Sequence, residues 1–151
     1  MTEFDFKVQL EVGQSGEADF LNMYPSKLEI HPGFDGDFIC KKTGDKIELK
    51  TDTYRMSDTP NFFIERYSDF HKKSPGSVWQ ALEHGCKRFC YYFVKDGVYF
   101  EFDNLPKLCN RLEKLIEGRS YIQVKNKAWV TIGYTIKRED LSDLYTEWSI
   151  E

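Results

Sequence analysis

The sequence contains no long hydrophobic run. Nowhere does an apolar stretch approach the roughly 18 residues that a helix needs to cross a bilayer. Residues 1–6 offer neither the basic region nor the apolar stretch of a secretion signal. From these absences we expect a cytoplasmic protein with no membrane partner.

Paired Cys-x-x-Cys spacings are also missing. The four cysteines lie at positions 40, 86, 90 and 109, which disfavours a structural zinc site built from them. His84, Cys86 and Cys90 do cluster in sequence, and a metal site there is the alternative. We expect instead reduced cysteines that act as small apolar side chains, as is common in the cytosol. A nucleophile elbow or catalytic-triad motif is absent as well.

With 151 residues, the chain can build one sizeable core, so we expect a single domain over residues 1–151. A hydrophobic content of 40% is typical of a folded globule. The net charge of −4 is uneven: residues 1–65 carry 13 Asp and Glu against 7 Lys and Arg, whereas residues 66–138 carry 7 against 14. An acidic half that collects cations beside a basic half that neutralises phosphates suits a metal-dependent nuclease. The alternative is basic side chains scattered over the surface.

Apolar periodicity and turn residues predict an α/β (α+β) fold with a central mixed β-sheet flanked by helices. Helices are expected over residues 16–24, 74–84, 105–116 and 141–148. Strands are expected over residues 28–31, 36–41, 46–51, 62–67, 88–94, 98–102, 121–125 and 128–136. Residues 52–61 are polar and include Pro60, so they are expected to form a loop, which could face a substrate.

An acidic hairpin is predicted in the first half of the chain. Its strands are residues 36–41 and 46–51, and its turn is Thr43-Gly44. Glu48 and Lys50 are two apart on one strand, so they project from the same face, roughly 7 Å apart. In this register Asp37 lies opposite Lys50 and diagonal to Glu48, near enough for two carboxylates to share a cation. The alternative is a solvated strand face with a weak ion pair.

This arrangement resembles the PD-(D/E)XK nuclease superfamily, which has the restriction-endonuclease-like fold. The match is Asp37, or Asp35, followed by Glu48-Leu49-Lys50. Looser similarity to small phage-encoded nucleases extends over residues 61–68 and 75–81. Neither candidate acid follows the Pro of the family name, which leaves both open as the first metal ligand. The resemblance implies an αβββαβ core over roughly residues 14–94, to which a C-terminal hairpin and helix are added.

The resemblance further implies a metal-dependent endonuclease that hydrolyses DNA, with RNA left open as a substrate. A homodimer is compatible with it, and a phage-encoded enzyme would act in the cytoplasm of a bacterial host. Asp37, Glu48 and the backbone carbonyl of Leu49 would hold Mg²⁺ or Mn²⁺, hard cations that prefer oxygen ligands. Lys50 would orient or deprotonate the attacking water.

Three further residues are candidates for the site, each with an ordinary structural alternative. In the resembling family an acid on the first helix often completes the metal site, which points to Glu17; complementarity to the helix dipole is its alternative. Glu65 is either an acid near the metal or a polar position on a half-buried strand. Gln80 either meets a phosphate or is an exposed helix residue.

Two other classes of function are alternatives to a nuclease. One is a catalytically inactive nucleic-acid-binding module of the same fold. The other is a protein-interaction module whose surface is formed by alternating aromatic residues, namely Tyr91, Tyr92, Phe93, Tyr99, Phe100 and Phe102. Alternating aromatic residues on a hairpin are more often core than interface, so this class ranks below the first.

Overall fold

The computed structural model describes residues 28–30, 38–40 and 46–149. Over these ranges the chain is an α+β protein with two β-sheets and two α-helices. The larger sheet contains, in spatial order, β1 (Leu28–Ile30), β2 (Phe38–Cys40), β3 (Lys46–Asp52), β6 (Arg88–Phe93), β7 (Val98–Phe102) and β10 (Tyr145–Ser149). The smaller sheet contains β5 (Ser74–Pro75), β4 (Asn61–Asp69), β9 (Val130–Lys137) and β8 (Ile122–Lys125). The helices are α2 (Ser77–Glu83) and α3 (Leu105–Ile116), with short 3₁₀ turns η1 (Met56–Asp58) and η2 (Arg138–Leu141).

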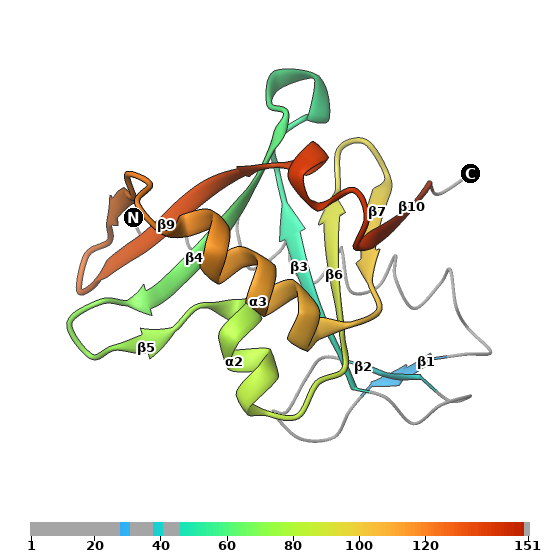
Figure 1. Cartoon of the computed structure of the whole chain (residues 1–151), viewed down its shortest axis with the longest axis horizontal. Coiled ribbons are helices and arrows are strands. Elements are labelled where there is room, and N and C mark those ends of the chain that lie inside the picture. Colours follow the sequence, from blue (N-terminus) through green and yellow to red (C-terminus); the bar gives the residue numbers. More distant parts are fainter. Residues whose placement is uncertain (1–27, 31–37, 41–45, 150–151) are drawn as a thin grey trace.

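The two sheets diverge from the top of the view in Figure 1, where β3, β6 and β7 stand upright and β4 and β9 run to the left. Helix α3 crosses the view between them, and α2 lies below it. The prediction of one central sheet is therefore wrong. After β3 the chain leaves the larger sheet, and β4 pairs with β9 in a second sheet. The α+β class itself is confirmed.

The larger sheet is mixed. Strands β3 and β6 are parallel, with Glu48 level with Phe89 and Lys50 level with Tyr91. The remaining pairs in this sheet are antiparallel. The chain between β3 and β6 contains β4, β5 and α2, so it makes the long crossover that two parallel neighbours require.

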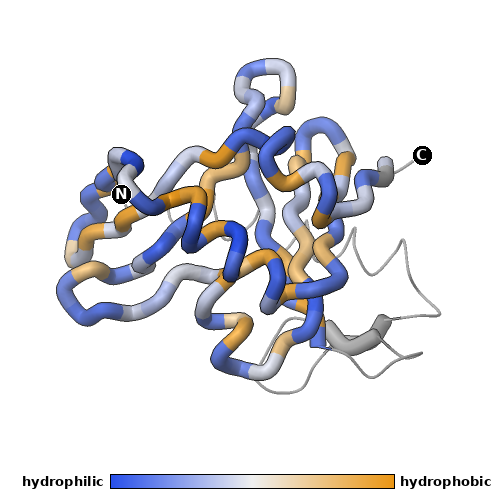
Figure 2. Tube along the Cα trace, viewed as in Figure 1, coloured by the Kyte–Doolittle hydropathy of each residue, from blue (hydrophilic) through white to orange (hydrophobic). Residues whose placement is uncertain are grey.

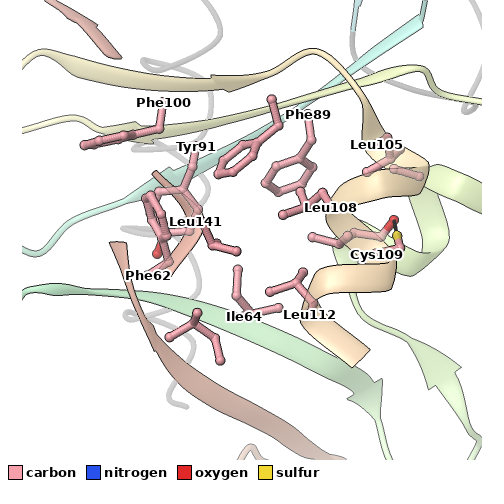
Figure 3. Packing of buried hydrophobic residues seen from close by; sticks show 14 of the residues in the cluster. Phe62, Ile64, Phe89, Tyr91, Phe100, Leu105, Leu108, Cys109, Leu112 and Leu141 are labelled. Carbon is pink, nitrogen blue, oxygen red and sulfur yellow. Dashed lines mark hydrogen bonds between the residues drawn. The ribbon is translucent and has the colours of Figure 1, made fainter. Parts of the chain in front are cut away.

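The hydrophobic core lies between the two sheets and the helices. Figure 3 shows side chains from β4, β6, β7 and α3 pointing toward one another. The six aromatic residues of the proposed interaction surface are each at most 2% exposed, so they belong to the interior and that hypothesis loses its basis. Cys90 and Cys109 carry free, buried thiols, and burial raises the pKa of Cys109 to about 11. A thiol that is protonated at neutral pH is a poor nucleophile, as expected for a small apolar side chain.

Helix α3 confirms the prediction made from its leucine spacing. The Asn104 side chain caps the helix by accepting the backbone N–H of Lys107 at 3.1 Å. Leu105, Leu108 and Leu112 are buried against the core. The helix therefore covers the inner face of both sheets with a single apolar stripe.

The C-terminal helix expected over residues 141–148 is wrong. Residues 145–149 form β10, which pairs antiparallel with β7. The Tyr145 ring packs edge-on against Phe100, with ring centroids 4.9 Å apart. The Arg111 guanidinium on α3 binds both carboxylate oxygens of Asp143, at 2.8 and 2.7 Å. Tertiary packing and this bidentate ion pair thus outweigh the weak helical tendency of residues 141–148.

The hairpin that carries Glu48 and Lys50 has a register different from the predicted one. Phe38 pairs with Ile47, whereas a turn at Thr43-Gly44 would have paired it with Leu49. A shift of two residues keeps every side chain on its predicted face, because side chains alternate with a period of two. The expected helix at residues 16–24 and the turn itself lie outside the described residues.

The segment expected to open the second helix divides at Gly76. Ser74 and Pro75 form β5 beside β4, and α2 begins only at Ser77. The Gly76 N–H donates to the Arg66 carbonyl at 2.9 Å, which brings the backbones of α2 and β4 into direct contact. A Cβ atom at position 76 would overlap the carbonyl of Glu65. Only glycine fits at position 76, because the nearby Glu65 carbonyl leaves no space for a Cβ atom.

We expect Gly76→Ala to lower the free energy of unfolding by about 1–3 kcal/mol, since the added methyl must push α2 away from β4. Urea denaturation measures the change. Gln80→Ala, on the exposed side of α2, is the matched control and should change stability by less than about 0.5 kcal/mol. Equal stabilities for Gly76→Ala and the control would contradict the close approach.

Candidate functional site

An open cleft of about 880 Å³ lies where the end of β3 meets the second sheet. Its walls are the last residues of β3, the loop that follows, and the face of β4, β9 and β8 turned away from the core. The lining includes Lys50, Asp52, Tyr54, Asp58, Asn61, Phe63, Glu65, Ser68, Tyr91, Ile122, Val124, Asn126, Trp129, Thr131 and Thr135. The cleft therefore combines one amine and three carboxylates with hydroxyl, amide and aromatic groups.

Strand alternation explains which side of β4 lines the cleft. Phe62 and Ile64 point into the core, so Asn61, Phe63 and Glu65 point the other way. The pairing of β4 with β9 shifts between Glu65 and Tyr67, a bulge that inserts one residue. After the bulge it is Ser68 that returns to the cleft face.

Lys50 is the one lysine among the described residues that line the cleft. Its side chain is only 17% exposed, and its Nζ lies 4.0 Å from Oε1 of Glu65. The amine also lies 5.4 Å from the centroid of the Phe63 ring, a cation–π contact. Burial lowers the pKa of Lys50 from its ordinary value, and the negative charges of Glu65 and Asp52 oppose that shift. The result is an amine more easily deprotonated than an exposed lysine.

The Tyr91 hydroxyl joins the two sheets at the inner end of the cleft. It donates to Oδ2 of Asp52 on β3 and accepts the backbone N–H of Phe63 on β4 at 3.1 Å. Oδ1 of Asp52 accepts the N–H of Tyr54 at 2.8 Å. Burial, followed by the charge of Asp52, raises the pKa of Tyr91 well above its ordinary value, so the phenol stays protonated as a donor.

The segment predicted to be a loop, residues 52–61, connects β3 to β4 through the turn η1, and it forms one wall of the cleft. Figure 2 shows mostly hydrophilic colours along this loop at the top of the view. Arg138 holds it in place: its guanidinium donates to the carbonyls of Thr59 at 2.8 Å, Asn61 at 3.3 Å and Met56 at 3.4 Å. The backbone N–H of Met56 also donates to Asp96 at 2.8 Å. The middle of the loop and the end that leads into β4 are thus anchored by Asp96 and Arg138.

The structure brings together two of the predicted site residues, Lys50 and Glu65. Glu48 is half-buried on the same face of β3, two positions before Lys50, but does not line the cleft. The Leu49 side chain is buried on the opposite face of the strand. Gln80 is exposed on α2 and does not line the cleft either, which fits its alternative as an ordinary helix residue.

Three predicted metal ligands, Glu17, Asp35 and Asp37, lie outside the described residues. Within residues 28–30, 38–40 and 46–149, no three His, Cys, Asp or Glu side chains are close enough to hold a metal ion together. That finding concerns sites built wholly from this part of the chain. The predicted ligand set includes Glu48 from the described part and acids from outside it.

Sequence reasoning missed several residues of the cleft. Asp52 follows Glu48 and Lys50 at the next alternate position of the same strand, so the period of two could have identified it. Tyr91 was recognised only as one of several aromatic residues. Tyr54 and Trp129 come from a loop and a hairpin end whose positions are set by tertiary structure, and no local signal marks them.

No protein-family model and no curated protein sequence matches this chain. Of the described helices, none has the length and apolar character to span a membrane. The function therefore has to be argued from the chain's own residues and geometry.

We expect the pKa of Lys50 to lie below that of an exposed lysine and to fall further in Glu65→Gln, because the Glu65 charge favours the ammonium form. NMR titration of the Lys50 ε-methylene and ζ-nitrogen measures both values. Asp58→Asn, in the same cleft but not among the groups that shift Lys50, is the control and should leave the pKa unchanged. A pKa that rises in Glu65→Gln would contradict the assigned contact.

Proposed function

We propose that this chain is a metal-dependent endonuclease that hydrolyses DNA phosphodiester bonds, with a core like that of the PD-(D/E)XK nucleases. The observation that carries the proposal is the position of Lys50. Its amine is nearly buried, has a lowered pKa, and stands in an open cleft two residues after a half-buried glutamate on the same strand face. Perturbed amines in clefts are characteristic of catalytic groups.

The order of elements supports the proposal. Three strands, β1, β2 and β3, are followed by helix α2 and then by β6, which lies beside β3. This is the strands–helix–strand order that the resemblance implies for the core. The chain departs from it by placing β4 and β5 between β3 and α2, and β4 contributes Glu65 to the cleft.

The charge of the cleft supports a requirement for a metal ion. Its lining carries Asp52, Asp58 and Glu65 against the single amine of Lys50. A phosphate diester would be repelled by this excess of carboxylates unless a cation were present. Glu48 offers the oxygen ligand that hard cations prefer, and in the proposal Asp37 or Asp35, Glu17 and the Leu49 carbonyl complete the set. When bound, Mg²⁺ or Mn²⁺ would supply charge neutralisation and a lowered pKa for water.

Lys50 then has the role of positioning the attacking water and stabilising the negative charge that develops on the phosphate. Glu65 keeps the amine oriented, since its carboxylate is 4.0 Å from Nζ. The hydrogen bond from Tyr91 fixes Asp52. DNA is the preferred substrate in this proposal, RNA is the alternative polymer, and a homodimer is compatible with it.

Glu48→Ala and Lys50→Ala should each reduce cleavage by about 100-fold or more while the protein stays folded, because the proposal makes Glu48 a metal ligand and Lys50 the positioning amine, and neither is part of the core cluster. The assay is cleavage of plasmid, single-stranded and branched DNA with Mg²⁺ or Mn²⁺, with circular dichroism to check folding. Lys95→Ala, an exposed lysine outside the cleft, is the matched control. Wild-type turnover by both site variants on a cleaved substrate would refute the assignment.

Cleavage should also stop in excess EDTA and be poorly supported by Ca²⁺, whose looser coordination positions water less well. A wild-type protein that binds DNA but cleaves none of the three substrates with either metal would favour the inactive binding module instead. Full activity in EDTA would exclude the metal-dependent mechanism.

Asp37→Asn is expected to abolish Mn²⁺ binding, whereas Asp35→Asn should leave most of it. The reason is the register of the hairpin. Phe38 pairs with Ile47, and in sequence Asp37 directly precedes Phe38 while Glu48 directly follows Ile47. Isothermal titration of Mn²⁺ into both variants measures the difference. Loss of the ion in Asp35→Asn with retention in Asp37→Asn would make Asp35 the partner of Glu48.

A further inference from the structure

The cleft extends from Lys50 along an open face of the second sheet. Core residues cover one face of this sheet, while the other presents Phe63 from β4, Thr131 and Thr135 from β9, and Ile122 and Val124 from β8. All four residues of β8 are exposed. Ile122 and Val124 are 42% and 40% exposed, so this face presents apolar side chains to the solvent.

Aromatic side chains stand at intervals along this face. Trp129, 38% exposed, lies at the far end beside the β8–β9 turn, and Tyr54 lies on the loop at the near end. Between them the Phe63 ring lies directly over Gly133, where a Cβ atom would collide with it. The side-chain amides of Asn61 and Asn126 line the same cleft.

Exposed lysines gather at the Trp129 end. Lys72 and Lys73 lie in the turn between β4 and β5, Lys125 is the last residue of β8, and Lys127 lies in the turn between β8 and β9. The two turns are neighbours, because the Phe70 N–H donates to the Val130 carbonyl at 2.8 Å. These four lysines thus lie near the Trp129 end of the cleft, outside its lining.

We propose that this face binds single-stranded nucleic acid, with bases stacked on Trp129 and on the apolar side chains of β8, and with backbone phosphates at the four lysines. This proposal rests on the proposed function and names its substrate class: a single strand, or a strand end opened from a duplex, that leads to Lys50. Aromatic platforms bind any base by its π-face, and lysines bind the backbone irrespective of sequence.

The dimensions and chemistry of the cleft favour a single strand over other occupants. A volume of about 880 Å³ lies in the range of sites that bind small molecules. Stacking needs bases that are not paired inside a helix. Hydroxyl and amide groups at the cleft walls can meet base edges, which an apolar peptide or lipid chain would leave without partners.

The test measures binding of a fluorescent oligonucleotide, as a single strand and as a duplex of the same sequence, to the wild-type protein in Ca²⁺, which neutralises the carboxylates of the cleft but should support little cleavage. We expect the single strand to bind more tightly and Trp129→Leu to weaken its binding roughly tenfold, with Trp129→Phe close to wild type. Tyr121→Ala is the matched control, since this tyrosine is 59% exposed next to β8 but does not line the cleft. Replacing Lys125 and Lys127 by Gln should lower the salt dependence of binding.

Equal binding of the duplex and the single strand would overturn the proposal, and so would unchanged binding by Trp129→Leu. The proposal would also be overturned if oligonucleotide binding were lost in the lysine variants but not in Trp129→Leu. Cleavage assays separate this result from the proposed function. If the wild type cleaves DNA while Trp129→Leu binds normally, only the binding face is wrong. If Trp129-dependent binding is found without any cleavage, the binding face stands and the nuclease activity does not.

Discussion

The phenolic hydroxyl of Tyr91 connects the parts of the structure on which the cleft depends. Its ring lies in the core, 4.8 Å from the ring of Phe62, while its oxygen bonds both the Asp52 carboxylate on β3 and the backbone of β4. Together with the ion pair between Lys50 on β3 and Glu65 on β4, this contact adds polar interactions to the apolar packing between the two sheets. Hydrogen bonds are directional, so the tyrosine fixes how closely β4 approaches the end of β3.

That approach decides the environment of Lys50. Because β4 lies against the end of β3, Glu65 and the Phe63 ring both reach the amine. The same approach removes most water from around the amine and leaves it accessible only from the cleft. A lysine on an isolated hairpin with the same sequence would be an ordinary exposed ammonium group. The chemistry proposed here is therefore a property of two sheets and not of the Glu-x-Lys motif alone.

Local sequence patterns predicted the elements whose stability is local. The Asp96-Gly97 turn and the alternating aromatic residues beside it indicate the β6–β7 hairpin, and leucines at helical spacing indicate α3. The shared strand face of Glu48 and Lys50 was predicted correctly because the period of a strand is fixed. The shift in hairpin register could not have been predicted, since two registers that differ by two residues expose the same faces.

The features that the sequence did not predict depend on contacts between segments that are distant in the chain. β10 forms a strand because β7 offers an unpaired edge and the Phe100 ring a surface for Tyr145, and neither is visible in residues 141–149. The place of Glu65 in the cleft depends on the close approach of Gly76 and on the pairing of β4 with β9. The strand that carries Glu65 and the charge of its side chain were evident from the sequence, but its contact with Lys50 was not.

Arg138 gives the cleft a property that affects the kinetics of binding. Because its guanidinium bridges three carbonyls of the β3–β4 loop, the protein's own contacts hold this wall of the cleft in place. A preorganised wall spares the entropy of ordering a loop, so association would be governed by diffusion and charge and not by closure. Lysine lacks the planar guanidinium group whose several N–H donors bind the three carbonyls, so it could not replace arginine in this role.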